Sequence, residues 1–175
     1  MELLKTIRDK DVVPNYKAGE EVKFNTKTQT VRAVILDEND QTPLIFDKHN
    51  NHYKIPGGGI ESGESLEEAL NREVLEEAGC QAEVIAELGK IVELPEQTKK
   101  QLESDCYLAK LVGEKGEPQY DDTEKSYGYS LEWINFDEAI VKAENVKATT
   151  YNGHFMRERD LTFLKKAKEI LDGSK

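Results

Sequence analysis

The chain is poor in cysteine. Cys80 and Cys106 are its two cysteines among 175 residues, and neither belongs to a Cys-x-x-Cys pair. This pattern argues against a disulfide framework and against a zinc site built on cysteine. We therefore expect two reduced thiols that pack in the core.

Long apolar runs are absent as well. No stretch approaches the roughly 20 apolar residues that a membrane-spanning helix needs. The N-terminal residues MELLKTIRDKD also lack the apolar region of a secretory signal peptide. We therefore expect a cytoplasmic protein that has no membrane partner. With 37% hydrophobic and 34% charged residues, the chain has the composition of one globular domain.

Positive charge is in deficit, because 24 Lys and Arg residues face 35 Asp and Glu residues, which gives a net charge of −11. A surface of this sign repels phosphate backbones and anionic membranes, so we expect no nucleic acid polymer as a partner. A small phosphate-bearing substrate would be repelled too, unless metal ions neutralise the acidic site.

Glutamate, by contrast, is concentrated in one glycine-rich segment, GGGIESGESLEEALNREVLEEAGC, at residues 57–80. Seven glutamates stand between positions 61 and 77, and Arg72 is the one basic residue among them. Ser65 and Glu68 have the spacing of a helix capping box, and Gly79 suits the position that follows a helix. The segment therefore predicts a loop that leads into a short helix.

The predicted helix has an unusual buried face. Leu66, Ala69 and Leu70 fall on one side of a helical wheel, which we expect to enter the core. One turn later the same side carries carboxylates, and these belong to Glu73, Glu76 and Glu77. Neighbouring carboxylates repel one another and resist burial, so we expect a cation between them unless the helix is simply solvated. Mg²⁺, with Mn²⁺ as a substitute, prefers such oxygen ligands.

This segment resembles the complete Nudix box, G-x5-E-x7-R-E-U-x-E-E-x-G-U, in which U is aliphatic. The match consists of Gly58, Glu64 and the unbroken run from Arg72 to Cys80. Cys80 replaces an aliphatic residue in the last position, where a cysteine acts as a small hydrophobe. Seven fixed residues at fixed spacing make this pattern specific. The chain therefore resembles the Nudix hydrolase superfamily and is MutT-like.

The resemblance implies an α/β fold, namely an α/β/α sandwich around a mixed central sheet, for residues 29–175. Residues 1–28 would form an N-terminal extension with a short strand near residues 21–24. Within the domain, the apolar residues 30–36 and 42–47 flank the polar turn DENDQ. This arrangement predicts two strands that pair as a hairpin.

The resemblance also assigns roles to individual residues. It implies that metal is held by the Gly57 carbonyl and by the carboxylates of Glu73, Glu76 and Glu77. Arg72 and Glu64 would form an orienting ion pair. One of the metal-binding glutamates, or a glutamate from a later loop, would activate water. Glu124 is our candidate for that loop residue, and its rivals are Glu103, Glu114 and Glu117. No other cofactor is expected.

The implied reaction is metal-dependent hydrolysis of a diphosphate linkage, which converts a nucleoside diphosphate derivative into a mononucleotide and a phosphorylated remainder. A MutT-like nucleoside triphosphate pyrophosphohydrolase is the leading hypothesis. Hydrolysis of ADP-ribose, nucleotide sugars or dinucleoside polyphosphates is the alternative, and Pro95, 15 residues beyond Cys80, resembles the ADP-ribose branch. A nucleotide-sensing module without turnover is a further alternative. Tyr53 or Lys54 could touch substrate, and residues 1–28 could contribute to a homodimer.

Overall fold

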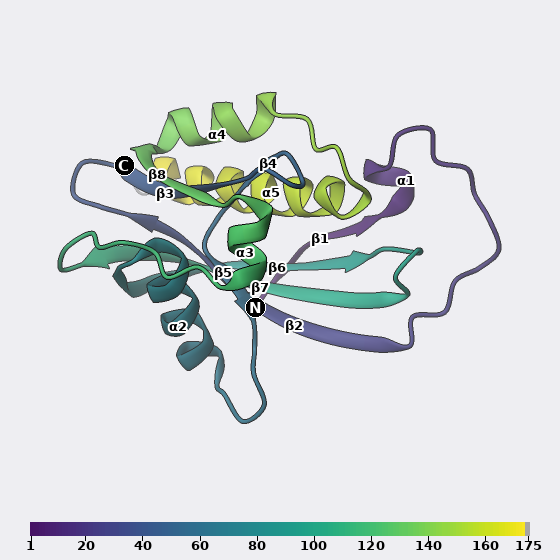
Figure 1. The fold of residues 1–175 in the computed structure, drawn as a ribbon, viewed down its shortest axis with the longest axis horizontal. Helices are drawn as coiled ribbons and strands as arrows, with labels where there is room; N and C mark the ends of the chain where they lie inside the picture. Colours follow the sequence, from purple (N-terminus) through teal and green to yellow (C-terminus); the bar gives the residue numbers. More distant parts are fainter. Residues whose placement is uncertain (174–175) are drawn as a thin grey trace.

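The computed structural model describes residues 1–173, which form two sheets and five helices (Figure 1). The strands are β1 Leu3–Arg8, β2 Thr26–Leu36, β3 Gln41–Asp47, β4 His52–Lys54, β5 Gly57–Gly59, β6 Gln81–Leu94, β7 Lys100–Val112 and β8 Ser130–Asn135. The helices are α1 Asp9–Val12, α2 Leu66–Ala78, α3 Asp122–Tyr127, α4 Phe136–Asn145 and α5 Tyr151–Gly173. None of these helices, including the 23-residue α5, combines the length and the apolar character of a membrane span.

The larger sheet is mixed, as the sequence predicted. Its strand order is β1-β6-β7-β2-β5, with β1 parallel to β6 and β2 parallel to β7. The β6–β7 and β2–β5 pairs are antiparallel. A smaller antiparallel sheet has the strand order β4-β3-β8. Because β4 leads directly into β5, this sheet lies next to the glycine-rich segment.

Helices cover both faces of the larger sheet, which confirms the α/β/α sandwich (Figure 1). Side chains alternate along a strand, so successive residues of β2 enter different cores. Val31, Ala33 and Ile35 join the cluster that contains the buried side of α2. Val34 and Leu36 join the cluster that contains α5. β2 is therefore buried on both faces, which explains its nearly continuous apolar sequence.

The predicted strands at residues 30–36 and 42–47 are present as parts of β2 and β3, but their pairing as a hairpin is wrong. β3 lies in the smaller sheet, and the backbone N–H of Asp37 donates to the carbonyl of Gln41 at 3.0 Å across the turn. The physical reason is that the backbone of β3 pairs elsewhere, with β8 along Gln41–Phe46 and with β4 at Ile45–Asp47. β2 instead pairs with β7 along one edge and with β5 at Thr30–Arg32 on the other.

The N-terminal segment differs from the prediction. Residues 21–24 contain no strand, whereas β1 near the N-terminus pairs in parallel with the second half of β6. Asp9 after β1 is buried and accepts hydrogen bonds from the Tyr151 hydroxyl at 2.7 Å and from the Glu96 backbone N–H at 2.9 Å. Residues 3–12 therefore pack on the sheet and α5, while a domain boundary at residue 28 stays a prediction.

The helix predicted from the glycine-rich segment is α2, and its caps are confirmed. The Ser65 side chain accepts from the backbone N–H of Glu68, and Gly79 ends the helix in the left-handed conformation with φ of 63°. Ala69 and Leu70 are buried as expected. The prediction that Leu66 is buried is wrong, because it is 36% exposed. As the first residue of α2, Leu66 lies outside the core cluster and lines an open groove.

Both cysteines are free and buried, which confirms the prediction of reduced core thiols. Burial raises the pKa of the Cys80 thiol to about 11. Burial also raises the pKa of the Cys106 thiol. Since the thiolate is the reactive form of cysteine, neither residue has the environment of a nucleophile.

Candidate active site

Carboxylates from α2 and α3 converge in a cavity of about 470 Å³ beside the glycine-rich loop. Glu73, Glu76 and Glu124 line this cavity together with Arg72. Glu73 and Glu77 lie on the buried side of α2, with Glu77 only 2% exposed, whereas Glu76 is half-exposed. Burial raises the pKa of Glu73, and the neighbouring Glu77 carboxylate adds to the effect. The sequence prediction that α2 turns carboxylates toward the protein interior is therefore confirmed for Glu73 and Glu77.

Two glycines of the loop permit a close approach between backbone and carboxylates. A Cβ atom at Gly58 would lie 2.4 Å from both carboxylate oxygens of Glu73. Gly57 has φ of 138°, and a Cβ atom there would lie 2.2 Å from the Val31 carbonyl oxygen. Glycine is required at these positions because any side chain would overlap the site or the sheet.

Arg72 binds three carboxylates at once. Its Nε and Nη2 atoms donate to the two oxygens of Glu64 at 2.9 and 3.0 Å. Its Nη1 atom donates to Glu73 at 2.8 Å and to Glu76 at 3.2 Å. The bond with Glu64 lowers the pKa of that carboxyl and raises the pKa of Arg72 further. Arg72 thus holds the carboxylates in position on the side of α2 that faces the cavity.

Glu77 is held by a cation from the smaller sheet. The Nζ atom of Lys54, in β4, donates to one oxygen of Glu77 in a short ion pair. The backbone N–H of Gly57 donates to the other oxygen at 2.8 Å. Lys54 also lies 4.9 Å from the centre of the Tyr129 ring. Lys54 and Glu77 are 23 positions apart, so no local pattern in the sequence could pair them.

Among the loop glutamates proposed from the sequence, the structure brings Glu124 to the other carboxylates. Its pKa is raised to about 7, first by burial and then by the neighbouring Glu77 carboxylate. Glu103, which lies on β7, instead forms an ion pair with Lys27 at 2.9 Å. Glu114 and Glu117 are exposed and do not line the cavity.

A short helix that the sequence analysis missed positions Glu124. The backbone N–H of Glu124 donates to Asp121 at 2.8 Å, and the backbone N–H of Asp121 donates back to the Glu124 side chain at 2.8 Å. This capping box begins α3, and its Asp-x-x-Glu spacing is the signal that could have revealed the helix. Before α3, the N–H of Gln119 donates to the carbonyl of Glu76 at 2.6 Å, which ties the loop to α2.

The oxygen-rich cavity suits a hard divalent cation. Within residues 1–173, however, no group of three or more His, Cys, Asp or Glu side chains already has the arrangement that holds a metal ion. Glu73, Glu76 and Glu124 line the cavity, and Glu77 lies beside it. Their carboxylates provide oxygen donors of the kind that Mg²⁺ and Mn²⁺ prefer. Arg72 and Lys54 now occupy several of these oxygens. The Gly57 carbonyl accepts a hydrogen bond from Nη1 of the buried Arg32 at 2.8 Å. The carboxylates can therefore bind a metal ion if the Lys54 ammonium moves away from Glu77. The Gly57 carbonyl can bind the ion only if the same oxygen also accepts the hydrogen bond from Arg32.

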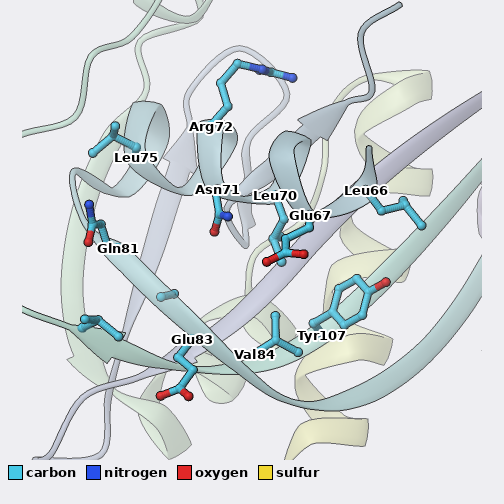
Figure 2. A pocket seen from close by; sticks show the side chains of 12 residues that line it. Leu66, Glu67, Leu70, Asn71, Arg72, Leu75, Gln81, Glu83, Val84 and Tyr107 are labelled. Atoms are coloured by element: carbon cyan, nitrogen blue, oxygen red, sulfur yellow. The ribbon is translucent and has the colours of Figure 1, made fainter. Parts of the chain in front are cut away.

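A larger cavity lies elsewhere. A groove of about 920 Å³ lies between the outer side of α2 and the strands β6 and β7 (Figure 2). Figure 2 shows Leu70 and Val84 at this groove, whereas the Arg72 side chain points away from it. None of the four converging carboxylates lines the groove. We place the chemistry in the smaller cavity, because it contains the groups that can bind metal and move protons.

The family of the chain follows from a comparison with known proteins. The model of the NUDIX domain matches residues 26–157, so the chain belongs to the Nudix family. The sequence resemblance is confirmed, and it places the chain among hydrolases that act on phosphoric anhydrides. Nudix hydrolases generally use divalent metals such as Mg²⁺.

The relatives differ in the substrate that their names give. A protein of Bacillus subtilis (strain 168), called "Putative 8-oxo-dGTP diphosphatase", is 32% identical over 62% of this chain and 66% of its own length. The ADP-ribose pyrophosphatase of Methanocaldococcus jannaschii is 31% identical over 63% of this chain and 71% of its own length. Two further relatives are called RNA pyrophosphohydrolases. The MutT protein of Methanosarcina mazei Go1 shares the fold, with a TM-score of 0.56 and 19% identity over 82% of this chain and 95% of that chain.

Proposed function

We propose that this protein is a metal-dependent nucleoside triphosphate pyrophosphohydrolase of the MutT type. It would hydrolyse a diphosphate linkage and release a mononucleotide and pyrophosphate. The observation that carries this proposal is the convergence of Glu73, Glu76, Glu77 and Glu124 beside the glycine-rich loop. A protein that only senses nucleotides has no need for a paired, partly buried glutamate that can accept a proton.

In the proposed site, Glu73, Glu76 and Glu77 would hold Mg²⁺ or Mn²⁺. The bound ion would neutralise phosphoryl oxygens and lower the pKa of its water. Glu124, whose pKa lies near neutrality, would take the proton as water attacks phosphorus and the bridging phosphoanhydride bond breaks. Arg72 would position the carboxylates through its bonds to Glu64, Glu73 and Glu76 rather than touch substrate.

The alternative substrate is ADP-ribose or a related nucleotide derivative, which the M. jannaschii relative favours by its name. Pro95, which resembles that branch in its offset, lies at the turn between β6 and β7 and does not line the carboxylate cavity. The position of Pro95 therefore gives the alternative no support. The B. subtilis relative favours nucleoside triphosphates by its name.

A turnover assay tests the proposed function. With Mg²⁺, the protein is expected to cleave nucleoside triphosphates or 8-oxo-dGTP faster than ADP-ribose, nucleotide sugars, dinucleoside polyphosphates and 5′-triphosphorylated RNA. EDTA should abolish the reaction, and added Mn²⁺ should restore it. Preferred cleavage of ADP-ribose would favour the alternative. Metal-dependent nucleotide binding without turnover would favour the sensing module.

Glu124→Gln is expected to lower kcat by at least about tenfold, because the amide cannot accept the proton of the attacking water. The change should leave KM nearly constant if Glu124 acts in the chemical step. Initial rates of pyrophosphate release over a range of substrate concentrations measure both constants. Glu117→Gln is the matched control, since Glu117 lies in the loop that precedes α3 but is exposed and outside the cavity. An equal effect of both substitutions would place the base elsewhere.

The location and the oligomeric state stay predictions. We propose a cytoplasmic protein, and we propose that residues 1–28 contribute to a homodimer. β1 from this segment is the first strand of the larger sheet, so one of its edges is unpaired within residues 1–173. Unpaired edges can accept a strand from another chain. Multi-angle light scattering on the full chain measures the mass directly.

A further inference from the structure

Lys54 occupies an unusual position for a lysine. It is 7% exposed at the end of β4, and its ammonium group lies against Glu77. The carboxylates of Glu73 and Glu124 also act on it electrostatically, since Lys54 lowers the pKa of each of them in opposition to burial. A buried ammonium among carboxylates provides the positive charge that these groups require away from water.

The contacts of Glu77 show a conflict between this lysine and a metal ion. One oxygen accepts from Lys54, and the other accepts from the Gly57 N–H, so both oxygens of Glu77 are occupied. A divalent cation bound to Glu77 would lie close to the Lys54 ammonium. Two positive charges a few ångströms apart in a partly buried site repel each other strongly. A divalent cation at the same oxygen of Glu77 would therefore compete with the short bond to Lys54.

We propose that Lys54 is an internal counterion, which neutralises Glu77 in the metal-free protein and leaves Glu77 when a divalent cation binds. The inference rests on the metal site of the proposed function. The lysine stem is flexible, and the face of the Tyr129 ring, 4.9 Å away, remains a favourable surface for the released ammonium. Position 54 lies outside the Nudix box, which begins at Gly58.

Metal affinity tests the proposal without an activity assay. Calorimetric titration of Lys54→Met with Mn²⁺ should show an affinity at least about tenfold higher than in the unchanged protein, because binding no longer has to break the ion pair. Lys142→Met is the matched control, since Lys142 also pairs with a glutamate and lies 5.7 Å from a tyrosine ring but is only partly buried. Its affinity for Mn²⁺ should stay within about twofold. An unchanged or weaker affinity in Lys54→Met would overturn the proposal.

Lys54→Met leaves Glu77 buried without its partner, so the variant can fail to fold. A second measurement therefore uses the unchanged protein. Acetylation with an amine-reactive reagent, followed by peptide mass spectrometry, should modify Lys54 at least about fivefold faster with Mn²⁺ than without it. The reason is that the bound ion separates Lys54 from Glu77 and makes the amine accessible to the reagent. Lys142 should react equally fast in both conditions. Equal protection of Lys54 with saturating Mn²⁺ overturns the proposal.

These results separate the counterion from the proposed reaction. If Mn²⁺ releases Lys54 but no substrate is cleaved, the counterion proposal is supported and the proposed function is contradicted. If Mg²⁺-dependent cleavage occurs while Lys54 stays protected, the counterion alone fails. Absence of any Mn²⁺ binding in calorimetry overturns the counterion together with the metal site.

Discussion

Glu73→Gln is expected to lower kcat by about a thousandfold in the presence of Mg²⁺, because the site would lose an anionic oxygen ligand beside the reacting phosphate. Glu73 combines three features of a functional carboxylate. It is buried, it lies against the backbone of Gly58, and it accepts from Arg72 at 2.8 Å. Glutamine keeps the shape of the side chain but removes its charge. Steady-state kinetics over a range of Mg²⁺ concentrations measures the loss.

Glu67→Gln is the control for this prediction. Glu67 belongs to the same helix and is exposed on the opposite side, at the groove of Figure 2. Its substitution should change kcat by less than about twofold, as expected for a solvated surface charge. A loss of less than tenfold in Glu73→Gln, with normal folding, would contradict a role for Glu73 as a metal ligand.

Gly58→Ala is expected to lower kcat by at least about a hundredfold while it changes the free energy of unfolding by less than about 1 kcal/mol. The added methyl group would overlap the carboxylate of Glu73, which lies 2.4 Å from the Cβ position. That carboxylate is the end of a flexible side chain, so it can move away at little cost to the fold. The same movement displaces it from the site. Kinetics and urea denaturation of one preparation measure both effects.

The two neighbouring glycines provide opposite controls for Gly58→Ala. Gly59→Ala should be nearly neutral, because nothing lies within 4 Å of its Cβ position. Gly57→Ala should destabilise the fold strongly, because its Cβ would overlap the backbone of Val31 and Arg32, and its φ of 138° disfavours alanine. If Gly58→Ala lost stability and activity together, the glycine would serve the fold rather than the position of Glu73.

The parts of the site that the sequence predicts are those set by local spacing. The capping box at Ser65 and the end of α2 at Gly79 follow from spacing alone. The contact between Arg72 and Glu64, eight positions apart, was implied by the resemblance to the Nudix box. Helix geometry and a short loop bring such residues together, so these contacts depend little on how distant elements pack. The prediction of a buried carboxylate face on α2 succeeded for the same reason.

The parts that the sequence could not provide depend on which elements meet in space. Lys54 reaches Glu77 of helix α2 from the smaller sheet, and Arg32 reaches the Gly57 carbonyl from the neighbouring strand β2. The false hairpin has the same origin, since apolar alternation reveals a strand but not its partner. Glu124 is intermediate, because its helix has a local capping signal while its contact with Glu77 depends on the fold.

The alternation of β2 between two cores also has a consequence for how the length of this chain can vary. A single inserted or deleted residue within β2 would move every following side chain to the other face of the sheet and separate Arg32 from Gly57. Residues 13–25 precede β2 and contain neither helix nor strand, so they can lengthen or shorten without shifting that register. Differences in length between this protein and its relatives should therefore collect in residues 13–25 and be absent from β2.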